Sequence, residues 1–194
     1  KFVKHIRSIN SDGVIFSDFR HGIFNPLSIK KFTKNIHNKI IKVADSQVSN
    51  RWGNILDFKN FDLILPNEKE ARFSLADQDS GVRQLGTKLY LESKAKYLIM
   101  KLGEKGIISF RNEATHPRDF FPIESFVKDL EDGLGAGDAL LAASSLALIV
   151  SKNIVVASIL GNCAAALACE KKGNDPISQK DLLSKLNLIE KEIK

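Results

Sequence analysis

Long hydrophobic runs are missing from this chain of 194 residues. No apolar run reaches the roughly 18 residues that a membrane-spanning helix needs, so we expect no membrane partner. The longest run, 139–150, contains two serines and is typical of a buried helix. No secretory signal is visible at the start of the sequence, which indicates a cytoplasmic protein. An initiator methionine is also missing, which indicates a fragment of a longer protein.

Cysteine is scarce, and its placement argues against a disulfide framework. The two cysteines, Cys163 and Cys169, lie in one predicted helix. A rise of about 1.5 Å per residue puts them about 9 Å apart, which is too far for a disulfide. Both are therefore expected to be small buried residues in a reducing compartment. The four histidines are scattered along the chain, so the sequence offers no metal-ligand spacing.

Acidic residues are the minority among the charged ones, and the net charge is +6. The lysines are dispersed, and no basic patch alternates with aromatic residues, so we expect no nucleic-acid partner. A positive field instead suits a small phosphorylated substrate or ATP. A hydrophobic share of 43% is ordinary for a globular protein of this size.

Short apolar runs alternate with helical segments, and this alternation predicts a layered α/β/α fold with a mostly parallel sheet. Ligands of such folds bind beyond the carboxyl ends of the strands. We expect a single domain over residues 1–194, with one or two antiparallel strands around Phe120 and Phe126. Strands are predicted at 13–17, 39–43, 61–65, 97–100 and 106–110, and helices at 26–38, from 67 onward, and at 81–94, 138–150, 154–171 and 178–192.

The segment 132–138 carries the most specific chemical signal. Three small residues, Gly135, Ala136 and Gly137, precede Asp138 at the start of a predicted helix. Free amides and the positive end of a helix dipole make a ready site for phosphate, and small residues let the backbone approach the anion. A carboxylate beside such an anion hole suits a general base that takes a proton from an attacking hydroxyl. The alternative is that Asp138 is only a capping residue after a glycine-rich turn.

Two further elements have both a structural and a functional interpretation. Asn67 and Glu70 have the spacing of a capping box. The same side chains can also serve nucleotide phosphates, with Glu70 ordering the water around Mg²⁺ and Asn67 bonding to a phosphate or a water. Lys101, Gly103 and Gly106 form either a plain hairpin turn or a site where Lys101 pairs with the phosphates of ATP.

These three elements occur in one order: Asn67-x-x-Glu70, then Leu102-Gly103-Glu104-Lys105-Gly106, then Asp132-x-x-Gly135-Ala136-Gly137-Asp138. In this order they resemble the ribokinase-like (PfkB) carbohydrate kinases. Residues 161–173 are similar to the adenine-side helix and following loop of that family. Residues 17–22 resemble the Ser-Asp-Tyr-x-x-Gly stretch of its heptose-7-phosphate kinase branch.

The resemblance implies an enzyme that transfers the γ-phosphoryl group of ATP to a hydroxyl of a sugar or sugar phosphate, with Mg²⁺ as a cofactor. Asp138 would be the base, and the amides of Gly135, Ala136 and Gly137 would stabilise the moving phosphoryl group. Asp18 would reach the sugar side, or it caps the end of a strand. Asp132 would match a carboxylate that helps to hold a monovalent cation such as K⁺. The cofactor side would comprise Asn67, Glu70 (a Mg²⁺ contact through water), Lys101, Gly103, Gly106, Asn162 and Gly173.

Some positions depart from the family pattern. Gly133 and Lys101 stand where threonine is usual or frequent, and Gln47 replaces a lysine of the heptose-kinase branch. The amino-terminal strands, the Gly-Gly sugar motif and the β-lid are missing, so we expect the carboxyl-terminal, nucleotide-side portion of such an enzyme. A heptose 7-phosphate is the expected substrate. Fructose, ribose or a nucleoside as substrate, and a nucleotide-binding fragment without catalysis, are the alternatives, and a homodimer is left open.

Overall fold

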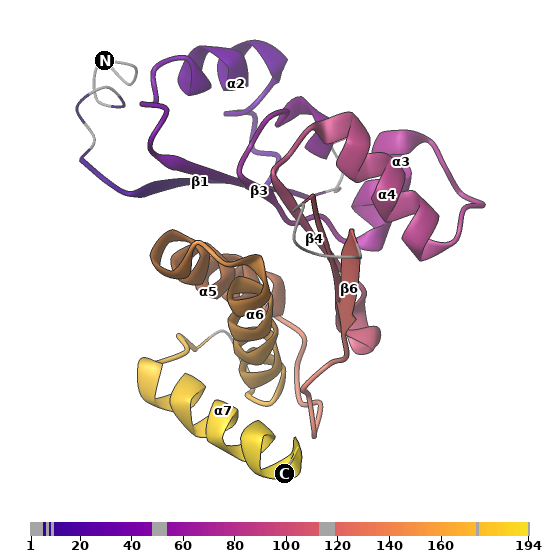
Figure 1. Ribbon diagram of the computed structural model, residues 1–194, viewed down its shortest axis with the longest axis vertical. Coiled ribbons are helices and arrows are strands. Elements are labelled where there is room, and N and C mark those ends of the chain that lie inside the picture. The colour runs from indigo at the N-terminus through magenta and orange to yellow at the C-terminus, as the bar shows by residue number, and fades with distance from the viewer. Residues whose placement is uncertain are drawn as a thin grey trace. The chain divides into compact units, whose positions relative to one another are not determined.

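The computed structural model describes residues 6, 8, 10–47, 54–112, 119–173 and 175–193. In this part of the chain six strands form one sheet, in their sequence order from β1 to β6 (Figure 1). The first four strands run parallel to one another, so the predicted α/β class with a mostly parallel sheet is confirmed. The strands are β1 (Gly13–Asp18), β2 (Ile41–Ser46), β3 (Leu63–Ile64), β4 (Tyr97–Lys101), β5 (Ile107–Arg111) and β6 (Phe120–Ile123).

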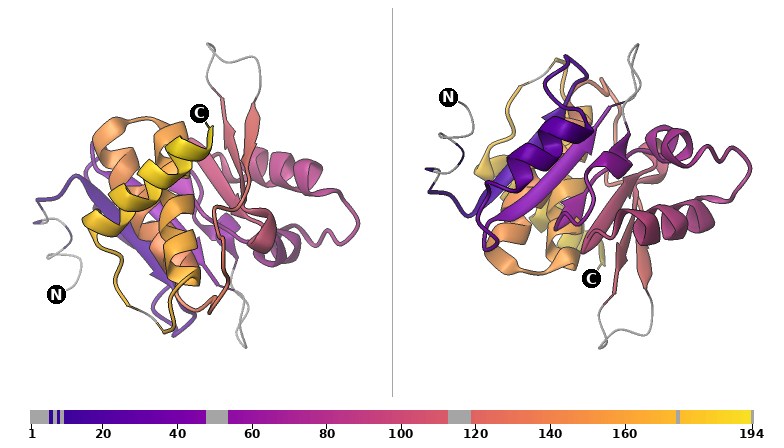
Figure 2. Two further views of the ribbon diagram at one scale, coloured as in Figure 1. Left: turned by 90° about the horizontal axis from the view of Figure 1, so that it is seen from below. Right: turned by 90° about the horizontal axis from the view of Figure 1, so that it is seen from above.

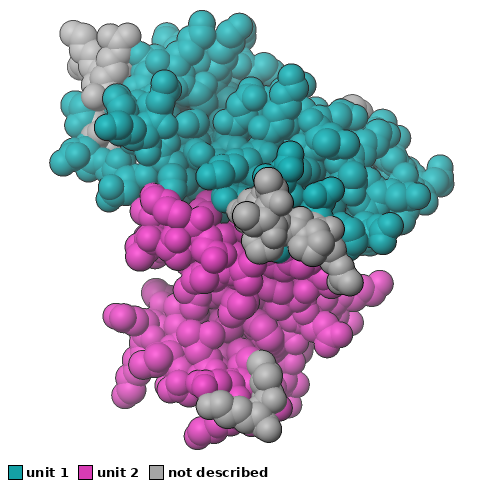
Figure 3. Space-filling model, in the orientation of Figure 1, with its two compact units in different colours: residues 1–100, 110–120 teal, residues 101–109, 121–194 magenta. Residues whose placement is uncertain are grey.

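The chain divides into two compact units (Figure 3). The first comprises residues 1–100 and 110–120, and the second comprises residues 101–109 and 121–194. Helices of the first unit are α2 (Pro26–Thr33), α3 (Glu68–Leu75) and α4 (Val82–Ser93), with the short 3₁₀ turn η1 (Ile55–Asp57). The second unit contains the 3₁₀ turn η2 (Gly103–Lys105) and the helices α5 (Ala136–Ser151), α6 (Ile154–Cys169) and α7 (Gln179–Ile193).

The central strands are buried, which explains their nearly continuous apolar sequence. In β4, residues 97–100 are all buried. Residues 43–44 of β2 pair with 63–64 of β3. Hydrogen bonding continues on both sides of this short pairing, because the amides of Asp62 and Leu65 donate to carbonyls of β2 at 2.9 and 3.0 Å. The predicted strand at 61–65 is therefore bonded over most of its length.

An aromatic cluster fills the core of the first unit. The rings of Phe16 and Phe61 lie edge to face with their centroids 5.1 Å apart, and those of Phe58 and Phe61 do so at 5.5 Å. Phe24 joins them with its centroid 5.5 Å from that of Phe16. Edge-to-face pairs are favoured over stacked sandwiches and bury large apolar areas. Through this cluster β1 packs against the segment that precedes β3.

Small residues let α5 and α6 pack closely in the second unit. Ser144 on α5 donates its hydroxyl to the Ala157 carbonyl at 3.0 Å, and Gly161 lies against the same serine. The hydroxyls of Ser109 on β5 and Ser158 on α6 are 2.8 Å apart and buried. The helix α7 lies beside α6 (Figures 1 and 2). Although α5 and α6 are rich in apolar residues, no helix of the described residues is long and apolar enough to cross a membrane.

Some predicted boundaries were wrong. The helix predicted at 26–38 ends at Thr33, because the side chain of Asn35 donates to the Lys31 carbonyl at 2.6 Å and so satisfies the helix end. The strand predicted at 39–43 lies at 41–46 instead. A strand is found near Phe120 but not near Phe126, which belongs to an irregular segment. The helices predicted at 81–94, 138–150, 154–171 and 178–192 are found to within two residues at each end.

Candidate functional site

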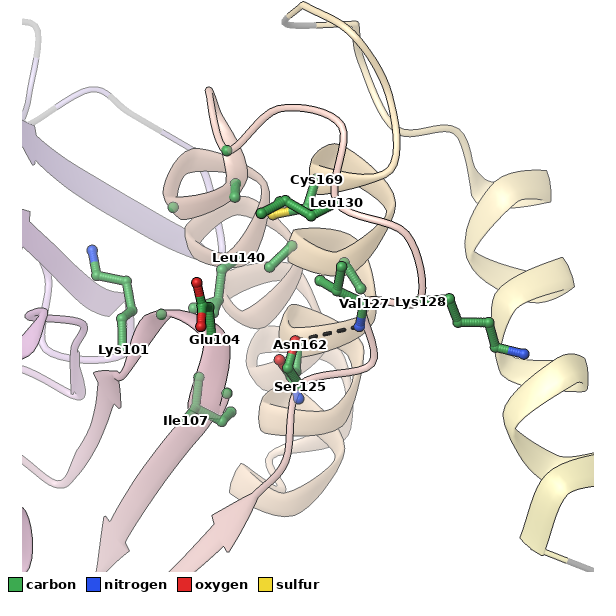
Figure 4. Close-up of a pocket in the computed structure, with 17 residues that line it drawn as sticks. Lys101, Glu104, Ile107, Ser125, Val127, Lys128, Leu130, Leu140, Asn162 and Cys169 are labelled. Atoms are coloured by element: carbon green, nitrogen blue, oxygen red, sulfur yellow. Dashed lines mark hydrogen bonds between the residues drawn. The ribbon is translucent and has the colours of Figure 1, made fainter.

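A cavity of about 550 Å³ lies within the second unit (Figure 4). This volume is in the range of pockets that hold small molecules and cofactors. Five pieces of the chain line it: the end of β4 with the turn that follows, the start of β5, parts of the irregular segment 125–133, the first turns of α5, and one face of α6. Most lining side chains are apolar or small, and the charged ones are Lys101, Glu104 and Lys128.

The first turn of α5 presents free amides to this cavity. Gly135 is the N-cap residue, with a φ of 78° that glycine adopts without steric cost. No side chain caps the helix, and the amides of Gly137 and Asp138 find no acceptor among the described residues. Ala136 and Gly137 line the cavity. Free amides at the positive end of a helix dipole form a site that suits an anion.

Lys101 brings a positive charge to the same place. A Cβ built on Gly137 would lie 3.9 Å from Lys101 Nζ, so the ammonium group is close to the first turn of α5. An anion bound at this place would be attracted by both the ammonium group and the positive end of the helix dipole. Lys101 and the glycine-rich turn were predicted as separate elements of a phosphate site. The structure places the Lys101 ammonium group beside Gly137 of that turn.

The turn between β4 and β5 depends on two glycines with positive φ. Gly103 has a φ of 60° and Gly106 one of 84°. The turn is closed by the Leu102 amide, which donates to the Gly106 carbonyl at 2.8 Å. A side chain at position 106 would collide with the backbone of residues 123–125. Around Gly103 a Cβ would meet nothing within 4 Å, so this side of the turn is open to a ligand.

One face of α6 forms another wall. Asn162, Ala165, Ala166 and Cys169 line the cavity and recur at the spacing of a single helix face. Asn162 is 4% exposed, and its side-chain amide donates to the Glu124 carbonyl at 2.7 Å. This bond attaches the irregular segment to the helix, so Asn162 shapes the cavity as well as lining it. That Asn162 lies near the adenine of a bound nucleotide stays a prediction.

Four predicted site residues of the second unit are not among those that line the cavity: Gly135, Asp138, Asp132 and Gly173. Asp138 is exposed in the first turn of α5 and makes no hydrogen bond or ion pair with the described residues. The carboxylate of Asp132 accepts from the Leu134 amide at 3.0 Å and so holds the turn that precedes α5. Gly173 has a φ of 82°, as expected for a glycine that follows a helix end.

Asn67 and Glu70 belong to the first unit, where they form the predicted capping box of α3. Asn67 Oδ1 accepts from the Glu70 amide at 2.8 Å, and Glu70 Oε2 accepts from the Asn67 amide at 2.6 Å. The side-chain amide of Asn67 also donates to Glu70 Oε1 at 2.8 Å. Glu70 is 4% exposed. The structural interpretation is therefore confirmed, and the role toward Mg²⁺ stays a prediction.

Asp18, also in the first unit, has both carboxylate oxygens engaged. Oδ1 accepts from the Arg20 amide at 2.9 Å, and Oδ2 accepts from the Arg20 guanidinium at 2.6 Å and from the Ser46 hydroxyl at 3.2 Å. These bonds fit a residue that caps the end of β1. Burial raises the pKa of the nearby Asp57 carboxyl, although the Arg20 charge opposes this change.

Sequence reasoning missed three residues of an irregular segment that line the cavity: Ser125, Val127 and Leu130. Such a segment has no hydrophobic period that could be recognised. The remaining α6 contributors could have been found, because they follow from Asn162 by helix register. Among the described residues, no group of three or more histidines, cysteines or acidic residues could hold a metal ion. Mg²⁺ commonly binds to substrate phosphates and water with few protein ligands, so this observation is compatible with a water-mediated contact.

The fold and the cavity define a class of protein: an α/β protein in which a glycine-rich helix start with free amides adjoins an apolar pocket. Residues 33–181 match the family described as pfkB family carbohydrate kinase. The chain belongs to this family.

Similar proteins agree with this family assignment. The chain is 31% identical over 169 residues to the bifunctional protein HldE of Campylobacter curvus, which covers 85% of this chain and 34% of that protein. It is 29% identical over 166 residues to the bifunctional protein HldE of a Nitratiruptor species, covering 84% of this chain and 33% of that protein. The chain therefore spans about a third of the length of these relatives.

Solved structures share the fold. Phosphofructokinase-2 from Escherichia coli in complex with potassium superposes with a TM-score of 0.80 at 18% identity, covering 97% of this chain and 60% of that one. Ribokinase from Thermotoga maritima superposes with a TM-score of 0.73 at 23% identity, covering 94% of this chain and 61% of that one. At these identities the likeness concerns the fold alone.

Proposed function

We propose that the cavity of the second unit binds ATP, and that the full-length protein transfers the γ-phosphoryl group to a hydroxyl of a sugar or sugar phosphate. One observation carries this proposal: Lys101 and the free amides of Gly137 and Asp138 converge beside a cavity of about 550 Å³. Membership of the pfkB family supports it. A cytoplasmic location, where ATP is abundant, is part of the same proposal.

The two ends of the site have different chemistry, which suits the two ends of a nucleotide. The apolar face of α6, with Ala165 and Ala166, is suited to a base. The positive end, with Lys101 and the amides of the glycine-rich turn, is suited to phosphates. Gly103 leaves the turn open for a close approach of the nucleotide. When bound, ATP supplies the phosphoryl group and Mg²⁺ neutralises part of its charge.

Asp138 is the proposed general base. Its carboxylate is exposed and uncommitted among the described residues, so a substrate hydroxyl can reach it. As the hydroxyl oxygen forms its bond to the γ-phosphorus, the bond from that phosphorus to the bridging oxygen breaks and ADP leaves. The hydroxyl proton passes to Asp138. The free amides of Gly137 and Asp138 stabilise the charge on the phosphoryl oxygens during this transfer, whereas the Ala136 amide, predicted to do so with that of Gly135, already donates to the Gly133 carbonyl at 3.4 Å.

Two ion contacts belong to the same proposal. Glu70, fixed by its capping box with Asn67, would order a water of the Mg²⁺ shell. Asp132 would help to hold a monovalent cation. The crystal structure of a fold relative in complex with potassium makes K⁺ the first ion to test.

The substrate is proposed to be a heptose 7-phosphate. Residues 17–22 resemble the corresponding stretch of the heptose-7-phosphate kinase branch. The two relatives quoted above share the name HldE, which also favours one branch of the family. Fructose, ribose and nucleosides stay as alternatives because Gln47 departs from the pattern of that branch.

The test is a substrate panel on the full-length protein. ADP release is measured with ATP, Mg²⁺ and each acceptor in turn: heptose 7-phosphate, fructose 6-phosphate, fructose, ribose and a nucleoside. We expect turnover with one sugar class, and greatest turnover with heptose 7-phosphate. Turnover with another acceptor would keep the kinase and replace the substrate. ATP binding without turnover of any acceptor would indicate a nucleotide-binding module, and no ATP binding would refute the proposal.

A further inference from the structure

The helix α7 is attached to the cavity wall by a buried ion pair. Lys185 on α7 has a side chain that is only 3% exposed, and its Nζ lies 2.5 Å from Glu170 Oε1. Lysine is almost never buried unless it is paired, so this contact fixes where α7 can lie. Glu170 directly follows the end of α6, one residue after Cys169, which lines the cavity.

The same oxygen of Glu170 also binds the irregular segment 125–133, which forms the wall of the cavity nearest to α7 and is called the wall segment below. Glu170 Oε1 accepts a hydrogen bond from the Lys128 backbone amide at 2.8 Å. Lys128 lines the cavity together with its neighbour Val127. In Figure 4 the side chain of Lys128 points away from the cavity toward α7, where its ammonium group pairs with Glu192. The wall is therefore held from its outer side by the carboxyl-terminal helix.

We infer that Glu170 and Lys185 are positioning residues of the nucleotide cavity. The inference rests on the proposed function, because it assigns a role toward a nucleotide that the cavity is proposed to bind. The Lys185 charge keeps the Glu170 carboxylate turned inward, and the carboxylate then fixes the Lys128 amide. Without Lys185, the Glu170 side chain, which is 22% exposed, can turn toward water and release the wall segment.

A second ion pair of α7 provides a matched control. Lys171 and Asp181 lie 3.3 Å apart, with each side chain 36% exposed. This pair also connects α7 to the end of α6, but neither residue lines the cavity or bonds to a residue that does. Loss of this pair removes one attachment of α7 and leaves the wall untouched.

The first experiment compares single variants of the full-length protein by equilibrium binding of ATP. We expect Lys185→Met to weaken binding by about tenfold, the scale of indirect coupling between a supporting residue and a site. Glu170→Gln keeps an oxygen that can accept from the Lys128 amide but leaves the buried Lys185 charge without its counter-ion, so its affinity should fall between that of Lys185→Met and that of the parent protein. Lys171→Met should have no effect on affinity. Equal affinity for Lys185→Met and the parent protein would refute the inference.

The second experiment separates positioning of the wall from simple anchoring of α7. The double variant Glu170→Leu/Lys185→Met replaces the buried pair with apolar side chains of similar size, an exchange that often leaves stability unchanged. It also removes the acceptor of the Lys128 amide. We expect a melting temperature close to that of the parent protein with ATP binding still about tenfold weaker. If melting temperature and affinity both match the parent, the pair serves only to anchor the helix and the inference is wrong.

These experiments distinguish the inference from the function on which it rests. If the parent protein binds no ATP, the proposed function and the inference fail together. If the parent binds ATP and the variants bind it equally well, only the inference fails.

Discussion

Gly161 on α6 lies against Ser144 on α5 with no room for a methyl group between them. The Ser144 hydroxyl occupies the place that a Cβ at position 161 would need, and the Leu140 carbonyl would lie only 3.2 Å from that Cβ. The serine cannot easily turn away, because its hydroxyl donates to the Ala157 carbonyl at 3.0 Å. This close contact sets the distance between α5, which carries the proposed anion site, and α6, which supplies the apolar wall of the cavity.

Gly161→Ala should therefore destabilise the protein by about 1–3 kcal/mol, the usual cost of forcing a methyl group into a packed interior. Alanine favours a helix by up to about 1 kcal/mol over glycine, so steric conflict must exceed this gain. Urea unfolding measures the change. Ser144→Ala in the same chain should relieve part of the conflict, and the double variant should lose less stability than the two single losses added together. Simple additivity would contradict the packing argument.

The sequence predicted the local features better than the long-range ones. The capping box at Asn67 involves residues three apart, so its spacing alone revealed it. The approach of Lys101 to Gly137 was expected only through the family resemblance, because local spacing does not show how a strand end and a distant helix start pack together. Lys185 on an amphipathic helix gave no sign of burial, because most lysines at such positions are solvated.

The two cysteines should report on the cavity through their reactivity. Burial raises the pKa of the Cys163 thiol to about 11, against an opposing effect of the Lys185 charge. Burial also raises the pKa of Cys169, and the carboxylates of Glu170 and Asp132 reinforce the change. Only the thiolate reacts, so both should label slowly at pH 8. Cys169 lines the cavity and is partly exposed, so it should label faster than the fully buried Cys163.

Mass spectrometry after maleimide treatment at pH 8 measures this difference. Saturating ATP should slow the labelling of Cys169 several-fold and leave that of Cys163 unchanged, because the ligand would cover only the residue in the cavity. Labelling of Cys169 at the same rate with and without ATP would place the nucleotide elsewhere.

Lys101→Met should weaken ATP binding by about 10- to 100-fold, as expected for the loss of a charge-assisted contact to phosphate. Adenosine binding should change little, because the ammonium group lies beside the first turn of α5, where phosphates are proposed to bind. Calorimetry on both ligands provides the comparison. Lys105→Met is the matched control, since Lys105 is exposed on the same turn and is not among the cavity residues. An equal loss for ATP and adenosine would argue against a phosphate contact.

Asp138→Asn should lower turnover of the full-length protein by about 10²- to 10⁴-fold, the usual contribution of a general base. ATP should bind as well as before, or more tightly, because the variant removes a negative charge beside the anion site. A residue that only stabilises the helix start would behave differently: its loss would cost about 0.3–1 kcal/mol of stability and leave turnover intact. Asp79→Asn, which changes an exposed carboxylate in a loop of the first unit, controls for the loss of one charge. Turnover of Asp138→Asn equal to that of this control would remove Asp138 from the chemistry and leave the anion site without a base.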